Sequence, residues 1–410
     1  MDINNSSGPQ ELLRFARSPA GKRDANLVYD RIRSLTPIWR DADQGFWYVF
    51  GWEDCHEVMR SNRFTTAHLL PSHPRFARSA SLQFIASSLP ALDPPDHTRV
   101  RAVARRAFTP LVLKKHDSHV LTVIETAIRE LRGRQGFDLV ADYATVVTRS
   151  AIWELLGVPS QDHARFADWM SELFKLLSVP PPTDAEMDRI DAAMKHMLDY
   201  LSELIEQRRS RPGADLISAL VDTTSQANEA LTAREMTVTL GILLGGASDT
   251  TKTAISGGVR LMLDHPEQLQ RLLADPPLEA SAFEEILRVG GSVVLGNTRR
   301  VADDVEIAGQ RIARGERVIP VLAAANHDPA RFEAPHRFDI GRSPNHHLAF
   351  GAGIHSCIGN MLARNVGARA VGALLRAFPT MRLVNDGAEV NTNLITLRSW
   401  NRLPVAMGEG

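Results

Sequence analysis

The 410-residue sequence has few cysteines, no long apolar run and no marked excess of charge of either sign. Its two cysteines, Cys55 and Cys357, cannot form a disulfide framework, which favours a reducing compartment, and we expect a cytoplasmic protein. The most apolar stretch, Leu240 to Leu244 with its flanks, is far shorter than the ~20 residues that span a bilayer. With 47 basic and 48 acidic residues, the chain has little net charge to attract a nucleic acid or another polyanion.

The N-terminal residues Met1 to Gln10 are polar and lack the apolar core of a signal peptide or a membrane anchor. We therefore expect no membrane contact, and we treat residues 1–25 as a flexible N-terminal segment. The length alone would allow two domains. No linker, repeat or low-complexity segment divides the remainder, so residues 26–410 are predicted to form one large domain.

Helical periodicity dominates the sequence and predicts a mainly α protein with a small β-rich region. Strands are predicted at residues 37–40, 46–50, 305–307 and 317–322. No alternation of strands and helices appears, which argues against a doubly wound parallel sheet. A capping box at Thr232 to Glu235 opens a helical run that ends at Asp264, roughly 50 Å at 1.5 Å per residue. A helix of that length crosses the whole molecule.

Three prolines, at residues 180–182, separate two amphipathic helices predicted at about 161–178 and 183–208. The second helix begins with a capping box at Thr183 to Glu186. Such a helix pair can act as a lid over a buried site. The alternative, a plain helical hairpin on the surface, stays open.

The most informative stretch surrounds Cys357, in the sequence Phe-Gly-Ala-Gly-Ile-His-Ser-Cys-Ile-Gly over residues 350–359. Its three glycines let the backbone pass close to a flat object, and the apolar helical run that follows begins at Met361. Amide groups of the loop and the N-terminus of that helix favour a thiolate over a thiol. A cysteine thiolate on haem iron pushes electron density towards oxygen and favours O–O cleavage. The loop therefore predicts a metal ligand.

The pattern F-G-x-G-x-H-x-C-x-G resembles the haem-binding loop of the cytochrome P450 family and matches it at every defining position. The alternative is a buried cysteine in a glycine-rich turn. Further signatures extend the resemblance from about Asn26 to Met407. It implies a single large helical P450 haem domain over residues 26–410, with a long central helix over the haem. It also implies haem b, iron protoporphyrin IX, as the cofactor and Cys357 as the axial ligand of its iron.

The middle of the long helix resembles the family's oxygen-activating stretch A-G-x-[DE]-T-T, in the sequence Gly-Gly-Ala-Ser-Asp-Thr-Thr over residues 245–251. Two glycines inside a helix cost roughly 1 kcal/mol each relative to alanine, so a local benefit is expected. The resemblance implies Asp249 as the acid and Thr250 as the hydroxyl of a proton relay. Ala247 stands where the family has glycine, which leaves the position of the helix kink open. Close packing with a neighbouring helix is the alternative reason for the glycines.

Haem carries two propionates, which require cations and hydrogen-bond donors at fixed places. The resemblance implies four haem-binding side chains besides the cysteine: His97, Arg101, Arg299 and His355. The first two come from a segment, residues 93–101, that resembles D-P-P-x-H-x-x-x-R, and their spacing puts them on one helical face. For any single arginine, a solvated surface charge is the alternative, and we favour that alternative for Arg300.

A second charged motif, Glu285 and Arg288, resembles the family's E-x-x-R. Alone, such a pair is usually a surface ion pair worth little. The resemblance implies that it is buried together with Arg337 in a structural network, where loss of one partner would cost ~3–5 kcal/mol. We read Cys55 as a packing residue, and His346 and His347 as surface or loop residues.

The resemblance also implies a substrate site opposite the cysteine, lined mostly by apolar side chains that suit a mid-sized apolar or aromatic molecule. The implied residues are Leu69, Leu70, Phe84, Ile242, Gly246, Leu295, Asn297, Leu394 and Ile395. Electrons are expected from a ferredoxin and its ferredoxin reductase. A basic patch would steer an acidic ferredoxin to the cysteine side, and scattered solvated charges are the alternative. The candidate residues of that patch are Arg105, Arg106, Lys114, Lys115 and Arg364.

Together these features imply a monomeric haem-thiolate monooxygenase that inserts one oxygen atom from O2, typically as a hydroxyl group, into an apolar organic substrate. Secondary metabolism is the setting suggested by analogy of fold. Two alternatives stay open: the same fold catalyses peroxide-driven oxygenation or oxidative coupling, or the protein is a haem sensor or carrier. The Asp249–Thr250 pair favours the oxygen-dependent reaction, and a sensor or carrier would need no proton relay.

Overall fold

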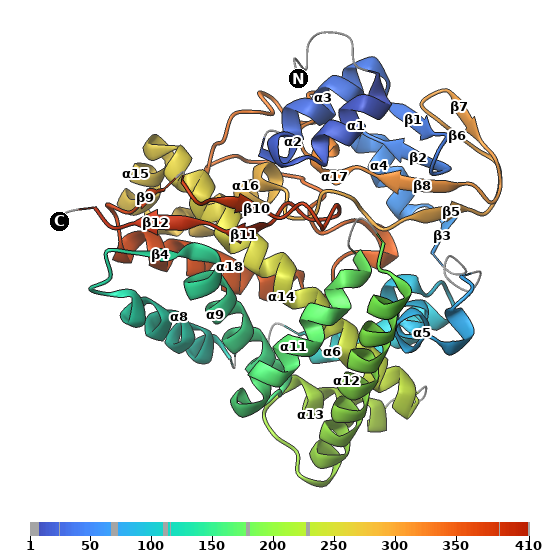
Figure 1. Cartoon of the computed structure of the whole chain (residues 1–410), viewed down its shortest axis with the longest axis horizontal. Helices are drawn as coiled ribbons and strands as arrows, with labels where there is room; N and C mark the ends of the chain where they lie inside the picture. Colours follow the sequence, from blue (N-terminus) through green and yellow to red (C-terminus); the bar gives the residue numbers. More distant parts are fainter. Residues whose placement is uncertain are drawn as a thin grey trace. The chain divides into compact units, whose positions relative to one another are not determined.

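The computed structural model of the chain describes residues 8–23, 25–66, 73–109, 114, 116–177, 181–226, 230–384 and 386–408. The chain forms two compact units. The first unit comprises Met1–Thr65, Ile124–Thr145 and Thr250–Gly410, and the second comprises Thr66–Val123 and Val146–Asp249. Helices predominate in both units, and every strand among the described residues belongs to the first (Figure 1). The predicted mainly α fold with a small β-rich region is confirmed, and a single haem domain over residues 26–410 stays a prediction.

The largest sheet is five-stranded, in the order β1-β2-β8-β5-β3 (Figure 1). Its strands are β1 (Ile38–Asp41), β2 (Phe46–Val49), β8 (Arg317–Pro320), β5 (Arg299–Val301) and β3 (Phe64–Thr65). The β1–β2 hairpin turns at Gly45, whose φ of +68° is the left-handed conformation that glycine tolerates best. Strand β8 pairs parallel with β2, while the other neighbours in the sheet are antiparallel. The predicted strands at 37–40, 46–50 and 317–322 are therefore confirmed, within two residues at each end.

The remaining strands of the first unit form three small antiparallel sheets. They are β4 (Gly136–Asp138), β12 (Pro404–Ala406) and β9 (Arg382–Leu383) in one sheet, β6 (Val305–Ile307) with β7 (Gln310–Ile312), and β10 (Glu389–Val390) with β11 (Trp400–Arg402). The strand predicted at 305–307 is confirmed by β6.

Helices of the first unit pack on both the sheet and each other. Their bounds are α1 (Pro9–Ala16), α2 (Pro19–Arg23), α3 (Ala25–Leu35), α4 (Trp52–Arg60), α15 (Pro266–Ala274), η7 (Pro276–Leu278), α16 (Glu279–Gly290), α17 (Leu322–Ala325), η8 (Gly353–His355) and α18 (Asn360–Ala377). Leu12 and Leu13 of α1 are buried in one core with α3 and β2. The segment 1–25, expected to be flexible, thus contains two helices, because α1 has an apolar face that this core covers.

The second unit contains a bundle in which α11, α12 and α13 lie side by side (Figure 1). Its elements are η1 (Phe76–Arg78), α5 (Ala80–Ser87), η2 (Leu89–Ala91), α6 (Asp96–Ala107), η4 (Arg149–Trp153), α10 (Glu154–Leu156), η5 (Ser160–Asp162), α11 (His163–Phe174), η6 (Lys175–Leu177), α12 (Asp184–Ser210) and α13 (Leu216–Gln226). Three elements take residues from both units: α8 (Asp117–Leu131), α9 (Thr145–Thr148) and α14 (Ala233–Asp264), while η3 (Leu139–Ala144) belongs to the first.

Both predicted capping boxes are present. At α12, the Thr183 amide donates to a Glu186 carboxylate oxygen at 2.8 Å, and the Glu186 amide donates to the Thr183 hydroxyl at 3.4 Å. At α14, Thr232 and Glu235 make the same exchange, at 2.8 and 3.2 Å. Each exchange satisfies amide groups that the first helical turn leaves without partners. The long helix α14 then runs to Asp264 as predicted.

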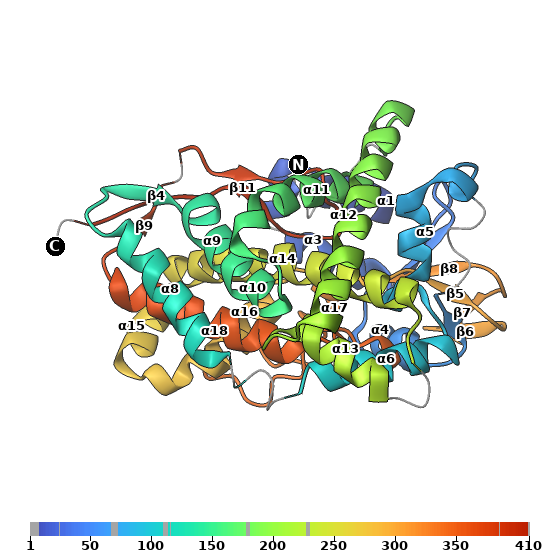
Figure 2. The ribbon, with the colours of Figure 1, turned by 90° about the horizontal axis from the view of Figure 1, so that it is seen from below.

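Within the first unit, small residues bring α14, α16 and α18 close together (Figure 2). A Cβ atom on Gly258 of α14 would lie 2.8 Å from Ile286 of α16. A Cβ atom on Gly367 of α18 would lie 2.0 Å from the Phe283 ring. Such approaches exclude any larger side chain, so they fix α18 against α16 directly after the cysteine loop. None of the described helices is long and apolar enough to span a membrane.

Candidate functional site

Cys357 lies on a short loop between η8 and α18. Gly351 and Gly353 on this loop have φ values of +68° and +69°, in the left-handed region that glycine tolerates best. A Cβ atom on Gly353 would also lie 2.5 Å from the main-chain oxygen of Met59, at the end of α4. The Cys357 amide donates to the Phe350 carbonyl at 2.8 Å, which closes the loop. Glycine is thus required here by both conformation and space.

The two cysteines occupy opposite environments. Cys357 is exposed, whereas Cys55 is fully buried on α4 and donates to the Val49 carbonyl at 3.2 Å. Burial raises the pKa of the Cys55 thiol far above its usual range, so this thiol stays protonated. The reading of Cys55 as a packing residue is consistent with this environment. Only Cys357 has the access that a ligand to an added group needs.

Two of the predicted haem-binding cations lie in the first unit with Cys357. Arg299 on β5 is 3% exposed, and its neighbour Arg300 points the other way and is exposed. This alternation is the ordinary geometry of a strand, and it assigns the surface position to Arg300 as expected. His355, on η8, is half-buried.

The other two, His97 and Arg101, lie on α6 in the second unit. His97 is 1% exposed and Arg101 is half-buried, one turn further along the helix. Asp93, which opens the same motif, accepts from the Thr66 amide at 3.0 and 3.1 Å and from the Thr66 hydroxyl at 3.2 Å. The aspartate of this motif therefore holds the preceding chain against the start of α6.

The middle of α14 is helical without a break, including at Ala247. The Ser248 hydroxyl donates to the Leu244 carbonyl at 3.0 Å and accepts from the indole nitrogen of Trp153 at 2.7 Å. Trp153 is 1% exposed on the π-helical element η4, so this is a buried contact between α14 and η4. Ser248 therefore has a structural role, beside the predicted relay residues Asp249 and Thr250. Sequence reasoning did not find the Trp153 contact, because the two residues are far apart in the chain.

The glycines of α14 serve two different purposes. A Cβ atom on Gly241 would lie 2.9 Å from the Phe84 ring, and one on Gly245 would lie 3.0 Å from the terminal methyl of Met170. No described residue lies within 4 Å of a Cβ atom on Gly246. Close packing thus explains Gly241 and Gly245, while Gly246 leaves room beside the helix.

The predicted substrate-site residues are divided between the units. Phe84, Ile242 and Gly246 belong to the second, where Phe84 is buried against α14. Four belong to the first: Leu295, Asn297, Leu394 and Ile395. Their two segments are adjacent, because the Val294 amide donates to the Thr396 carbonyl at 2.8 Å. Ile395 packs against the core around α1 and α3, and Asn297 is exposed. Leu69 and Leu70 lie outside the described residues.

A buried lysine holds the C-terminal segment of this set. Lys22 of α2 is 6% exposed, and its ammonium donates to the carbonyls of Asn391 and Leu394 at 2.6 and 2.7 Å. Burial and the charge of Arg398 lower the pKa of Lys22 to about 8. No sequence signal marks Lys22, since it lies far from residue 394 in the chain.

The E-x-x-R pair is fully buried, but one predicted partner is replaced. Arg288 donates to both carboxylate oxygens of Glu285 at 2.8 Å, and each side chain is 0% exposed. The Arg337 guanidinium is 68% exposed and pairs with Asp339, so the prediction that it completes this network is wrong. Arg342 takes that place, with its Nε 3.1 Å from Glu285. Arg337 contributes only its carbonyl, which accepts from Arg288 at 3.2 Å, because its side chain points away from the pair.

A second charged cluster lies beside this one. His347, predicted to be a surface or loop residue, has a side chain only 2% exposed, with its Nε2 3.0 Å from Glu284. Arg364, predicted to belong to a docking patch, pairs with the same carboxylate at 2.6 and 3.0 Å. His347 is therefore a loop residue, as one part of the prediction has it, but its side chain is not at the surface, because Glu284 lies within reach of the loop.

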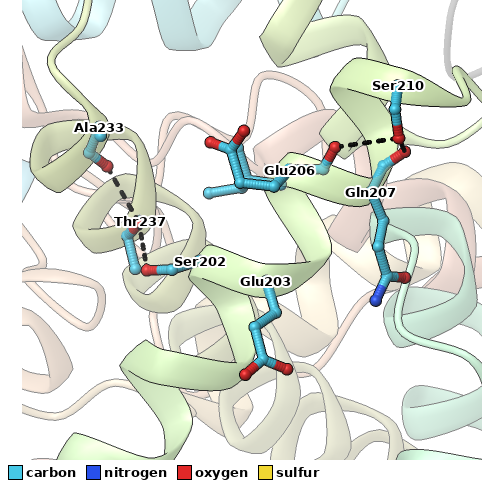
Figure 3. Close-up of a pocket in the computed structure, with 8 residues that line it drawn as sticks. Ser202, Glu203, Glu206, Gln207, Ser210, Ala233 and Thr237 are labelled. Carbon is cyan, nitrogen blue, oxygen red and sulfur yellow. Dashed lines mark hydrogen bonds between the residues drawn. The ribbon is translucent and has the colours of Figure 1, made fainter.

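A surface depression of about 670 Å³ between α12 and α14 contains none of the predicted site residues (Figure 3). Its lining includes Glu203 and Glu206, and Ser202 lies 3.2 Å from Thr237, hydroxyl to hydroxyl (Figure 3). The Thr237 hydroxyl in turn donates to the Ala233 carbonyl at 3.0 Å. The two hydroxyl groups that link its walls are thus occupied by each other and by the backbone, and we assign the depression no function.

The donor set of the chain suits an iron porphyrin. An exposed thiol on a loop bent by two glycines can reach a metal, and Arg299 and His97 are buried basic groups. Guanidinium and imidazole N–H groups donate hydrogen bonds to carboxylates, and haem carries two carboxylates. Thiolate ligation and cationic groups for the propionates define the class of haem-thiolate proteins.

Comparison with known proteins agrees with this class. The family model described as cytochrome P450 matches residues 137–393. Cytochrome P450 CYP107DY1 of Priestia megaterium is 37% identical over 314 residues, covering 77% of this chain and 75% of that protein. The cytochrome P450 monooxygenase PikC of Streptomyces venezuelae is 35% identical over 396 residues, covering 94% and 92%. The crystal structure of P450BioI with hexadec-9Z-enoic acid ligated acyl carrier protein has a TM-score of 0.88 at 29% identity, covering 95% of this chain and 100% of that one.

The chain belongs to the cytochrome P450 family, and it is a cytochrome P450 monooxygenase. Members of this family bind haem b, which is therefore the cofactor. They use O2 and receive electrons from a redox partner. The predicted P450 fold is confirmed by the solved structures that this chain resembles.

Proposed function

We propose that this monooxygenase hydroxylates a mid-sized, mostly apolar organic molecule of secondary metabolism. The observation that carries the proposal is the composition of the α14 surface in the second unit. There, Phe84 and Met170 pack onto glycines, while Gly246 keeps room beside the helix. Apolar walls with few polar groups suit an apolar ligand, and methionine adapts to irregular shapes. The relative PikC and the solved P450BioI complex are, by their names, a P450 monooxygenase and a protein seen with an acyl chain.

We assign haem binding to the side chains that the resemblance to the family implies. Cys357 would hold the iron through its sulfur, and the propionates would be held by the basic groups His97, Arg101, Arg299 and His355. Haem bound in this way supplies one-electron and oxygen chemistry, and the thiolate favours O–O cleavage. The chemistry of these side chains supports the assignment, because guanidinium and imidazole N–H groups donate hydrogen bonds to carboxylates.

Asp249 and Thr250 are assigned the delivery of protons. The Asp249 carboxyl takes protons from solvent, and the Thr250 hydroxyl passes them on towards the site. Ser248 is not part of this path, because its hydroxyl already contacts Leu244 and Trp153. The Trp153 contact holds α14 at the residue before Asp249, which keeps the relay in one place.

Electrons would come from a ferredoxin and its reductase to a monomeric, cytoplasmic enzyme. Arg105 and Arg106, at the end of α6, are both exposed and suit an acidic partner. Lys114 is exposed as well, and Lys115 lies outside the described residues.

The proposal is tested by turnover of the purified haem-loaded protein with a ferredoxin, its reductase and a library of apolar compounds. We expect hydroxylated product and a low- to high-spin shift on substrate binding. In Thr250→Ala, consumption of reductant should continue with product lowered by about a hundredfold, as expected when a general acid–base group is lost. Product formed from peroxide alone, or undiminished coupling in Thr250→Ala, would contradict the oxygen-dependent assignment.

A further inference from the structure

We propose that Glu284, Arg364 and Asn360 form a positioning network that holds the main chain of Cys357 and thereby sets how firmly its sulfur stays on the iron. The inference rests on the proposed ligation of haem iron by Cys357. It concerns only residues of the first unit. None of the three belongs to the predicted haem-binding residues.

The network is a continuous series of hydrogen bonds. Arg364 of α18 binds both carboxylate oxygens of Glu284 on α16, at 2.6 Å from its Nε and 3.0 Å from one terminal nitrogen. Its other terminal nitrogen donates to the side-chain oxygen of Asn360 at 2.9 Å. The Asn360 amide nitrogen then donates to the Cys357 carbonyl at 2.6 Å. The orientation of Asn360 is therefore fixed by Arg364, and the cysteine carbonyl is fixed by Asn360.

The same guanidinium also contacts the start of the cysteine loop. Its central carbon lies 4.3 Å from the centre of the Phe350 ring, a cation–π distance. The carbonyl of Phe350 accepts from the Cys357 amide at 2.8 Å. Arg364 is thus linked to Cys357 in two ways: through Asn360 to the Cys357 carbonyl, and through Phe350 to the Cys357 amide.

His347 secures the Glu284 end of the series. Its Nδ1 accepts from the Ala349 amide at 3.2 Å, which leaves Nε2 as the protonated nitrogen that donates to Glu284 at 3.0 Å. A neutral imidazole satisfies both contacts. The carboxylate therefore receives donors from α18 and from the residues just before Phe350, so it joins both ends of the loop.

These contacts distinguish positioning from docking. The nitrogens of Arg364 are engaged with Glu284 and Asn360, and its charge is neutralised by the carboxylate. A neutralised cation contributes little to the field that steers an acidic partner. A bidentate guanidinium also fixes direction in a way that a lysine ammonium does not. Arg364 is consequently removed from the docking patch and assigned to the loop.

The chain offers a matched control on the same two helices. Arg376 of α18 pairs with Glu279 of α16, with side chains 40% and 22% exposed, against 40% and 27% for Arg364 and Glu284. The control pair lies three turns of α18 beyond Arg364, away from the loop. Arg376→Met therefore removes an equivalent ion pair between the same helices without a contact to Cys357.

The test is the ferrous–CO spectrum of the purified haem-loaded enzyme. Thiolate ligation gives a red-shifted Soret band, and its loss gives a band at shorter wavelength. The measured quantity is the rate at which the red-shifted band converts to the band at shorter wavelength. It is measured in wild type, Arg364→Met, Glu284→Gln, the double variant of Arg364 and Glu284, Asn360→Ala and Arg376→Met. We expect conversion roughly five- to tenfold faster in the first four variants, as loss of a charge-assisted hydrogen bond implies, and unchanged in Arg376→Met.

The double variant separates position from charge. It keeps the net charge of the pair but lacks the bonds, so recovery of the wild-type rate would show a charge effect and overturn the inference. Asn360→Ala keeps the test valid if the charged variants fold poorly. Arg364→Met with an unchanged spectrum and a raised KM for ferredoxin would also overturn the inference, and would return Arg364 to the docking patch. A wild type without the red-shifted band would instead refute the ligation by Cys357 itself.

Discussion

The surroundings of Cys357 and the middle of α14 are built in contrasting ways. Three features hold the loop around Cys357 in its conformation. They are the positive φ values of its glycines, the bidentate ion pair of Arg364 with Glu284, and the hydrogen bond from the Asn360 amide to the Cys357 carbonyl. Along α14, the contacts are a phenyl ring and a methionine methyl resting on glycines. Hydrogen-bond networks specify one geometry, whereas thioether and glycine contacts tolerate several. The chain thus fixes its cysteine loop strictly and leaves the proposed substrate surface on α14 adaptable.

The strictest part of the first region is the Glu285–Arg288 pair. Glu285→Ala would leave a fully buried guanidinium without its carboxylate, which should lower the free energy of unfolding by ~3–5 kcal/mol and reduce haem retention. Denaturant unfolding and haem content measure both effects. Arg337→Ala is the matched control, since its side chain is 68% exposed and should change stability by no more than about 0.5 kcal/mol. Equal effects of the two changes would contradict the replacement of Arg337 by Arg342.

The neighbouring carboxylate predicts a dependence on pH. Burial of Glu284 acts to raise its pKa, but hydrogen bonds from His347 and Arg364 and the charge of Arg364 outweigh burial and lower the pKa to about 2, against 4.5 for an ordinary glutamate. This carboxylate therefore stabilises the fold fully above pH 4.5 and loses that contribution as the pH falls towards 2. The loss is on the order of 3 kcal/mol. Unfolding of wild type and Glu284→Gln from pH 6 to pH 2 should converge at the acid end, and parallel curves would contradict the assignment.

The smallest effects are expected in the adaptable region. Gly246→Ala should stabilise α14 by about 1 kcal/mol, because its Cβ atom would meet no residue that the structure describes, and it should change which compounds shift the spin state. Gly241→Ala places a Cβ atom 2.9 Å from the Phe84 ring, so overpacking of roughly 1–3 kcal/mol should cancel that gain. Thermal unfolding and ligand titrations compare the two. A loss of stability in Gly246→Ala would show that this side of α14 is filled.

The contrast between the regions also explains what the sequence could predict. The cysteine loop, the capping boxes and the bounds of α14 are local patterns, and the structure has them where they were predicted. Contacts between distant segments had no such pattern. Arg342 replaces Arg337 at Glu285, and Trp153 binds Ser248, because tertiary folding decides which side chain reaches a buried group. A stretch of sequence shows the type of a residue but not its partner.

The same limit applies to the charged and buried residues. The sequence predicted Arg364 to be a surface cation. Its charge is neutralised by Glu284, which lies on another helix, so this pairing could not be predicted from the residues near Arg364 in the chain. Lys22 carried no signal, yet it binds two carbonyls of the segment that contains Leu394. The roles of His97, Arg101, Arg299, His355, Asp249 and Thr250 in haem binding and proton delivery stay predictions.

The central claim, that the sulfur of Cys357 is the ligand of haem iron, is tested most directly by the ferrous–CO spectrum of three proteins. Wild type and Cys55→Ala should both show the red-shifted Soret band of thiolate ligation, because Cys55 is a buried packing residue. Cys357→Ser should lose that band. A red-shifted band that survives in Cys357→Ser, or that disappears only in Cys55→Ala, would contradict the account.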